Sequence, residues 1–261
     1  MTKKISPITT TDPWQQLKTY TRARIALGRV GTSLPTSEIL DFGLAHAMAR
    51  DAVHLALDVD ALSVQLEKLG ISTIQVNSKA ENRPTYLLRP DLGRQLSVKS
   101  AEDLRTMRPS KPITILIVVG DGLSSLAVER HVLPLLAEIQ QQMPSDWAIS
   151  PLVIASQARV AIADEIGEMM GASMTAMLIG ERPGLSSPDS LGIYLTYQPK
   201  VGLNDANRNC ISNVRPEGLS YEMAAKKMLW LIKEAMRIKA SGVSLKDESD
   251  VTEISQQAVL T

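Results

Sequence analysis

One continuous run, residues 113–119 (ITILIVV), constrains the fold of this chain more than any other feature. Seven consecutive aliphatic or β-branched residues are typical of a strand that is buried on both faces of a sheet. Further strands are predicted over residues 148–155, 174–179 and 191–197, with helices over 123–143, 160–170 and 220–240. This alternation predicts right-handed β–α–β crossovers. The fold class is therefore α/β, with a Rossmann-like, open and mainly parallel sheet.

The residues before this run predict a mainly helical N-terminal domain. Apolar residues at helical spacing follow the start signals of residues 35–38 and continue to residue 55, and further helices are predicted over 60–69 and 90–107. Two short β-rich stretches, residues 71–76 and 85–88, are predicted to pair as a small hairpin. The Pro-rich connector at 109–112 is the predicted boundary. The expected organisation is a flexible arm (1–13), a mainly helical domain (14–108), a Rossmann-like domain (109–242) and a mobile tail (243–261).

Charge and residue usage exclude several classes of protein. The 28 basic and 28 acidic residues cancel, which argues against a dedicated nucleic-acid binder. A single cysteine excludes a disulfide scaffold and a cysteine-only metal site, and three histidines leave little for a histidine-rich one. No apolar run approaches the ~20 residues of a membrane span, and Met1 begins no signal-peptide pattern. The expected protein is cytoplasmic, has few groups for acid–base chemistry, and suits an assembly with a partner chain.

Three turns follow the buried strands at equivalent positions: residues 120–124 (GDGLS), 156–160 (SQARV) and 180–184 (GERPG). Ligands of open α/β sheets bind outside the carboxyl ends of the strands, so these turns are predicted to border one crevice. Each turn is also explained by turn formation alone. Glu181 and Arg182 are the sharpest candidates, because a carboxylate and a guanidinium are fixed there between glycine and proline residues.

The remaining candidates are interpreted more plainly. Cys210 has no recognisable base in its local sequence and is interpreted as a packing residue rather than a nucleophile. The histidines and the aspartate of the first long helix are interpreted as surface or packing groups: His46, Asp51 and His54. The basic cluster consists of Arg22, Arg24 and Arg29. It is consistent with binding an anion or another subunit, and equally with a solvent-exposed face that binds nothing. The sequence therefore favours a cofactor-binding subunit over a self-sufficient enzyme.

Six stretches, in order along residues 17–242, resemble the small (light) subunit of adenosylcobalamin-dependent ethanolamine ammonia-lyase. They are residues 22–31 (RARIALGRVG), 88–94 (LRPDLGR), 121–124 (DGLS), 159–168 (beginning RV and ending DEIGE), 180–184 (GERPG) and 210–213 (CISN). The resemblance implies an ammonia-lyase that converts ethanolamine to acetaldehyde and ammonia by radical chemistry begun by cobalt–carbon homolysis. It also implies a TIM-barrel large subunit as partner, which encloses the corrinoid with this chain and holds most of the ethanolamine pocket.

By motif position, the resemblance places the cobalamin contacts on Val160, Glu181 and Cys210. It implies no catalytic residue and no metal ligand in this chain. Proteins that replace the cofactor's lower base with a histidine resemble one another in an Asp-x-His-x-x-Gly motif, and no histidine here has that context. Base-on adenosylcobalamin is therefore expected.

The two ends of the chain depart from the pattern of the family that it resembles. Some relatives carry a longer leader implicated in solubility or in packaging into a bacterial microcompartment, whereas the arm here is short, which argues against packaging; a microcompartment remains the alternative location. The tail beyond residue 242 extends past the recognised pattern.

The rival function is a non-catalytic α/β module that binds a nucleotide or metabolite for regulation. A self-sufficient dehydrogenase is disfavoured because the Gly-x-Gly-x-x-Gly fingerprint is missing.

Overall fold

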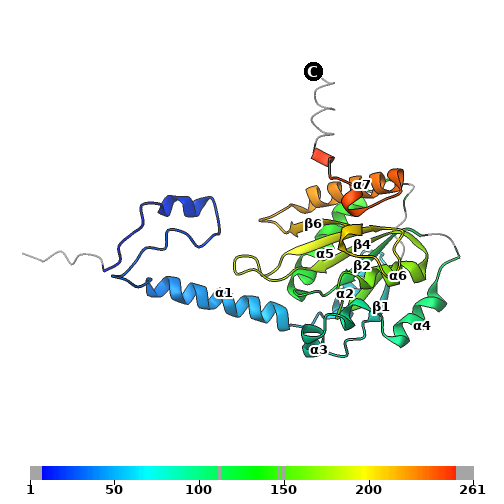
Figure 1. Cartoon of the computed structure of the whole chain (residues 1–261), viewed down its shortest axis with the longest axis horizontal. Coiled ribbons are helices and arrows are strands. Elements are labelled where there is room, and N and C mark those ends of the chain that lie inside the picture. Colours follow the sequence, from blue (N-terminus) through cyan, green and yellow to red (C-terminus); the bar gives the residue numbers. More distant parts are fainter. Residues whose placement is uncertain (1–7, 111–112, 146, 148–150, 251–261) are drawn as a thin grey trace, which may run out of the picture.

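The computed structural model describes residues 8–110, 113–145, 147 and 151–250. Within these residues, seven α-helices and one six-stranded sheet form an α/β fold, with helices packed on both faces of the sheet (Figure 1). A helical N-terminal region precedes most of the sheet, as the sequence predicts. The α/β class is thereby confirmed.

The sheet has parallel and antiparallel parts. Its strands are β1 (Thr73–Asn77), β2 (Ile113–Gly120), β3 (Leu152–Ser156), β4 (Ala172–Gly180), β5 (Leu191–Tyr197) and β6 (Arg208–Val214). Their order in the sheet is β1-β3-β2-β4-β5-β6. The pairs among β1, β3, β2 and β4 are parallel, whereas β5 and β6 are antiparallel to their neighbours. The predicted parallel sheet is therefore extended by two antiparallel strands, and a Rossmann-like topology stays a prediction.

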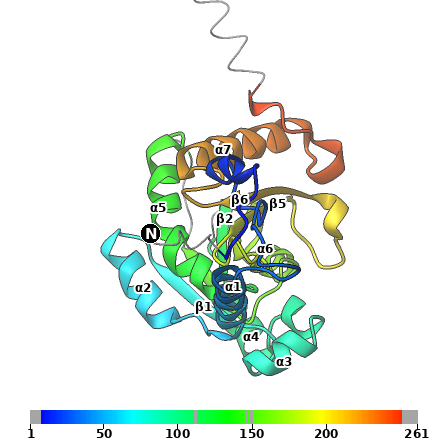
Figure 2. The ribbon, with the colours of Figure 1, turned by 90° about the vertical axis from the view of Figure 1, so that its left-hand side faces the viewer.

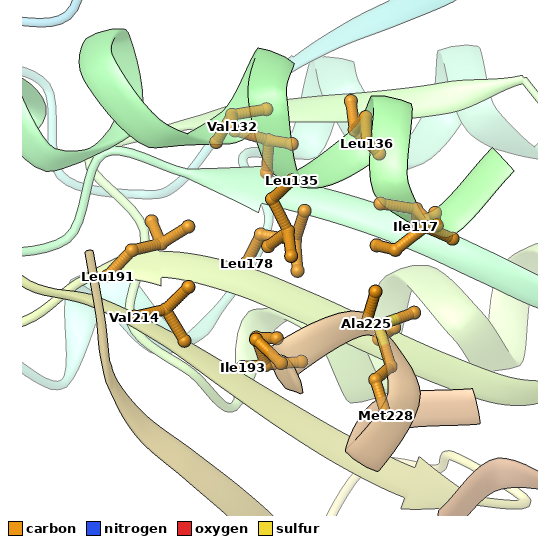
Figure 3. Packing of buried hydrophobic residues seen from close by; sticks show 14 of the residues in the cluster. Ile117, Val132, Leu135, Leu136, Leu178, Leu191, Ile193, Val214, Ala225 and Met228 are labelled. Atoms are coloured by element: carbon orange, nitrogen blue, oxygen red, sulfur yellow. The ribbon is translucent and has the colours of Figure 1, made fainter. Parts of the chain in front are cut away.

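The helices divide between the two faces of the sheet. They are α1 (Thr36–His54), α2 (Val59–Lys68), α3 (Arg83–Leu88), α4 (Val98–Met107), α5 (Ser125–Gln142), α6 (Ile162–Met170) and α7 (Tyr221–Ile238). Residues of α2, α5 and α7 pack on one face, and residues of α4 and α6 on the other. Strand β2 serves both cores, because its successive side chains alternate between them. Ile117 enters the α5/α7 cluster, which Figure 3 shows, while Leu116 and Val118 enter the opposite one.

The hairpin predicted from residues 71–76 and 85–88 is wrong. Strand β1 pairs in parallel with β3, from Thr73 opposite Leu152 to Asn77 opposite Ser156. Residues 83–88 form α3, whose N-cap Asn82 accepts a hydrogen bond from the backbone N–H of Thr85 at 3.0 Å. An Asn cap followed by proline in the first turn favours a helix start over a strand. One strand of the sheet thus comes from before the connector predicted as a domain boundary, and residues 111–112 of that connector lie outside the described residues.

The first part of the predicted mobile tail packs against the body. Leu245 is buried, and its carbonyl accepts a hydrogen bond from the Asn209 side chain at 2.8 Å. Lys227 of α7 forms ion pairs with Asp247 at 3.3 Å and Asp250 at 2.9 Å. Residues 251–261 of the predicted tail and residues 1–7 of the predicted arm lie outside the described residues.

Helix α1 projects away from the sheet and its helices. Figure 1 shows it extending outward with the preceding segment folded beside it, and Figure 2 shows it end-on. Of its 19 residues only Ala52 is buried. The predicted helix is confirmed, but its apolar side chains have no core to enter within the described chain.

Candidate functional site

A hollow of about 400 Å³ opens at the carboxyl ends of the parallel strands. Each of the three turns singled out by the sequence contributes to it, with Gly122 and Leu123 after β2, Arg159 and Val160 after β3, and Glu181 after β4. The prediction that these turns border one crevice is confirmed. The lining is completed by Tyr86, Ile179, Gly180, Arg182 and Tyr194.

Asp121 holds two of the turns together. Its side chain is 1 % exposed and accepts hydrogen bonds from the backbone N–H groups of Gln157 at 3.0 Å and Ala158 at 2.8 Å. It also pairs with the buried Arg83 of α3 at 3.0 Å. Burial raises the pKa of Asp121, while Arg83 and the backbone donors oppose that rise. The carboxylate therefore has a structural role: it links the turn after β2 to the turn after β3 and to α3.

A close approach between backbones forms the floor of the hollow. Gly122 has φ +58°, and a Cβ there would lie 2.1 Å from the carbonyl oxygen of Gly180. That same oxygen accepts a hydrogen bond from the Leu123 N–H at 3.0 Å. Only glycine combines this backbone conformation with this spacing. The Gly-Asp-Gly turn thus packs the end of β2 directly against the end of β4.

Tyr86 and Arg159 form one wall of the hollow. The Tyr86 hydroxyl donates a hydrogen bond to the Ala158 carbonyl at 2.9 Å, and burial raises its pKa. The Arg159 guanidinium lies 4.4 Å from the centre of the Tyr86 ring, within the range of a cation–π contact. The Arg159 Nε atom is buried and has no hydrogen-bond partner among the described residues. The wall therefore places a cation against an aromatic ring at the edge of the hollow.

Glu181 also lines the hollow, and hydroxyl groups from two separate segments of the chain hold its carboxylate in place. Its carboxylate accepts hydrogen bonds from the hydroxyl of Ser190 at 2.5 Å and from that of Ser212, on β6, at 2.5 Å. The backbone N–H of Asn213 donates to it at 3.3 Å. A carboxylate has about four acceptor positions, so these three donors fix its orientation and leave one acceptor position free.

Cys210 lies next to the hollow rather than in its lining. It is directly opposite Tyr194 in the β5–β6 pairing, and Tyr194 does line the hollow. Partial burial raises the pKa of the Cys210 thiol; Tyr194 opposes this rise, and the Glu181 carboxylate adds to it. A thiol with a raised pKa is a poor nucleophile, which agrees with the interpretation that Cys210 is not a nucleophile. Its side chain is exposed, however, so the interpretation of Cys210 as a packing residue is wrong.

The structure thus brings Val160 and Glu181 together in the lining and places Cys210 beside Tyr194, its partner on the neighbouring strand. Sequence reasoning missed Tyr86 and Tyr194. Tyr86 falls in a stretch that the sequence predicts as one strand of the hairpin, although the Asn82 cap indicates the start of a helix. Tyr194 sits in a correctly predicted strand, but its position beside Cys210 depends on a pairing register that no local pattern encodes.

The other sequence candidates lie elsewhere. His46 and His54 are on α1, where His46 Nδ1 lies 3.0 Å from the Phe42 carbonyl oxygen. His131 of α5 lies 2.8 Å from the Tyr221 hydroxyl, and burial lowers its pKa. None of the three lines the hollow. His46 and His54 are exposed surface groups, as the sequence predicts.

Comparison with known proteins identifies the family. The family described as "Ethanolamine ammonia-lyase light chain (EutC)" matches residues 11–246. The ethanolamine ammonia-lyase small subunit of Pseudomonas fluorescens (strain Pf0-1) is 56 % identical over 255 residues, 97 % of this chain and 93 % of the relative. Its counterpart in Pseudomonas syringae pv. tomato (strain ATCC BAA-871 / DC3000) is 58 % identical over 243 residues, 92 % and 85 % of the two chains. That of Pseudomonas putida (strain W619) is 58 % identical over 249 residues, 94 % and 92 %.

These matches agree with the motifs that the sequence itself displays. Among the described residues, no helix combines the length and the apolar character needed to cross a bilayer. With a family match over most of its length and relatives more than half identical, this chain belongs to the ethanolamine ammonia-lyase light-chain family.

Proposed function

We propose that this chain is the small subunit of an ethanolamine ammonia-lyase and that its hollow holds one side of adenosylcobalamin. The observation that carries the proposal is a juxtaposition. Val160 and Glu181, which the family resemblance names as cofactor contacts, share one hollow although they follow different strands, and Cys210 lies opposite Tyr194 of that lining in the β5–β6 pairing. When bound, the cofactor supplies the radical chemistry that deaminates ethanolamine.

The chemistry of the lining suits a corrinoid. Its ring is a broad apolar surface edged by amide side chains, which both donate and accept hydrogen bonds. The hollow offers apolar side chains at Leu123, Val160 and Ile179, an acceptor at Glu181 and a donor at Arg159. Glycine at position 122 allows the turns after β2 and β4 to approach this closely, because any side chain there would collide with the Gly180 carbonyl.

In this proposal the chain's residues bind and orient rather than transform substrate. Glu181 accepts from a corrin amide through its free acceptor position while Ser190 and Ser212 keep the carboxylate in place. Arg159, which lines the hollow, donates to a corrin carbonyl through its guanidinium. Each is positioned before the cofactor arrives, which lowers the ordering cost of binding.

The hollow opens to the surface, so a second protein must cover the other side of the cofactor. We assign that role to the large subunit, which also provides most of the ethanolamine pocket. The lining contains no histidine and no pair of carboxylates, so it supplies no acid–base set of its own. Nothing observed favours the alternative of a regulatory nucleotide- or metabolite-binding module.

The proposal keeps the cofactor base-on, with its own dimethylbenzimidazole on cobalt, because no histidine of this chain lines the hollow. Electron paramagnetic resonance of the complex tests this, using ¹⁵N-labelled protein and unlabelled cofactor in its cobalt(II) form. The expected axial coupling is that of ¹⁴N from the cofactor. A ¹⁵N coupling from the protein would contradict it.

Co-expression tests the function itself. The chain and the large subunit are expected to co-purify and to release acetaldehyde and ammonia from ethanolamine when adenosylcobalamin is added, with neither subunit active alone. A chain that stays separate from the large subunit, or a complex that is inactive with the cofactor, would contradict the proposal. We place this complex in the cytoplasm; co-sedimentation of the activity with shell proteins would instead place it in a bacterial microcompartment.

A further inference from the structure

The exposed apolar side chains of this molecule are concentrated in one region. Among the described residues, 19 large hydrophobic residues are exposed, and 11 of them lie between Ile8 and Leu55, in helix α1, its C-cap and the segment before it. Those on α1 are Ile39, Leu40, Phe42, Leu44 and Met48. Apolar residues gathered in this way mark an interaction surface in a folded protein.

The apolar residues of α1 lie on two sides of the helix. Leu40, Leu44 and Met48 follow one another at four-residue spacing and so share one face. Ile39 and Phe42 share another face at three-residue spacing. A pair of identical helices buries one stripe on each, whereas a helix that is apolar on two sides requires surroundings on both. This pattern fits a groove in a larger protein better than a second copy of α1.

The segment before α1 holds the helix in a defined setting without covering it. Lys18 pairs with Glu38 at 2.9 Å, and the Arg24 guanidinium donates to the Glu38 carbonyl at 2.9 Å. Arg24 also lies 4.4 Å from the centre of the Phe42 ring. Trp14 and Tyr20 nevertheless remain 66 % and 86 % exposed. The segment and α1 therefore form one preorganised projection.

The base of this projection is fixed beside the cofactor hollow. The Val53 carbonyl accepts a hydrogen bond from Arg83 at 2.8 Å, and Arg83 in turn pairs with Asp121 beneath the hollow. The Leu55 carbonyl accepts from the Ser125 hydroxyl at 2.8 Å. A second hollow, of about 380 Å³, is lined by Leu44 and Met48 on one side and the turn at residues 185–189 on the other. A protein that covers the cofactor hollow would therefore run alongside α1.

We propose that α1 and residues 8–35 are the main docking element for the large subunit, which receives α1 in an apolar groove. This inference rests on the proposed function, because it takes the large subunit as the protein that closes the hollow. The projection is large enough for the task, since a stable interface uses about 20–30 residues on each side. Docking beside the hollow would also couple assembly of the two chains to completion of the cofactor site.

A charge-bearing double variant tests the proposal. In Leu40→Lys/Leu44→Lys both changed side chains are exposed, at 67 % and 61 %, so the isolated chain is expected to keep its circular-dichroism spectrum and its unfolding midpoint. Its Kd for the purified large subunit is expected to rise at least about 100-fold, because two anchor residues are lost and two charges are brought to an apolar groove. The matched control is Val98→Lys, 71 % exposed at the start of α4, with a Kd within about threefold of wild type.

The outcomes separate this inference from the proposed function. If the wild-type chain does not bind the large subunit, the proposed function fails and the docking surface fails with it. If the wild type binds and the double variant binds within about threefold of it, only the docking surface is overturned. An isolated wild-type dimer that the double variant converts to monomer, with binding of the large subunit unchanged, would assign the surface to a second copy and likewise overturn the proposal.

A measurement on the unmodified chain tests the proposal even if the double variant misfolds. Hydrogen–deuterium exchange of the wild type, free and in complex with the large subunit, is expected to slow at least about tenfold in α1 on complex formation. Unchanged exchange across α1 in a complex that has formed would overturn the docking surface.

Discussion

Helices α1 and α5 are almost equal in length, 19 and 18 residues, yet they have opposite surroundings. Eight residues of α5 are buried, including Val132 and Leu135, which pack against the sheet (Figure 3). Only Ala52 of α1 is buried. Both helices carry apolar residues at helical spacing. Periodicity therefore predicts a helix in each case but does not say whether its apolar side chains are covered by the same chain or by a partner.

The largest expected effect concerns the buried ion pair that ties the base of α1 to the body. Asp121→Asn leaves Arg83 buried without its counter-charge and replaces a carboxylate that accepts two backbone N–H bonds. We expect a loss of about 3–5 kcal/mol in the free energy of unfolding of the isolated chain. Urea denaturation followed by circular dichroism measures it. A loss under about 1 kcal/mol would show that this network does not fix the body.

The next prediction sets the two helices directly against each other. Leu135→Ala removes a fully buried side chain of α5 and is expected to cost about 2–5 kcal/mol of unfolding free energy. The matched change in α1 is Leu44→Ala, at a side chain that is 61 % exposed, and it is expected to cost less than about 0.5 kcal/mol in the isolated chain. Equal losses would break the contrast, because α1 would then be packed within the free chain.

The third prediction concerns the body as the cofactor-binding region. Glu181→Ala in the assembled complex removes a charged acceptor worth about 1.5–3 kcal/mol, so the Kd for adenosylcobalamin is expected to rise about 10- to 150-fold. Cys210→Ser is expected to change it less than about threefold, since Cys210 is not among the residues that line the hollow. Spectrophotometric titration measures both values. Equal affinities for the wild type and Glu181→Ala would remove Glu181 from the site.

The smallest effect is expected at the contact between the projection and the body. Arg22 pairs with Glu217 at 3.3 Å, and the two side chains are 57 % and 49 % exposed. Exposed ion pairs contribute about 0.2–1 kcal/mol, so Arg22→Gln is expected to lower the unfolding free energy by no more than that. A loss well above about 1 kcal/mol would mean that the projection and the body unfold as one cooperative unit.

The sequence predicts the parts of this fold that depend on local patterns. The run at 113–119 becomes the central strand β2, and the turns after β2, β3 and β4 meet because the carboxyl ends of parallel strands lie at one edge. For strand β1 the sequence predicts the wrong partner, because its pairing with β3 joins residues about 80 positions apart in the chain. The sequence does not predict strand β6 (RNCISNV), since it lacks an apolar run.

The candidate site likewise contains some residues that local sequence patterns predict and some contacts that they do not. Val160 and Glu181 were found through turns that a sequence displays, although their role came from the family resemblance. Tyr194 reaches Cys210 only through the register of β5 and β6, and the Glu181–Ser212 hydrogen bond likewise joins separate strands. Such contacts are set by tertiary packing. The exposure of α1 is also invisible in the sequence, where its apolar spacing resembles that of a core helix.

The most direct test of the central claim is a cryo-electron-microscopy map of the complex with the large subunit and bound cobalamin. The account predicts corrin density over the hollow, in contact with Val160, Tyr194 and the Glu181 carboxylate, and with the large subunit on its other side. Corrin density that is enclosed by the large subunit alone, away from the turns after β3 and β4, would contradict it.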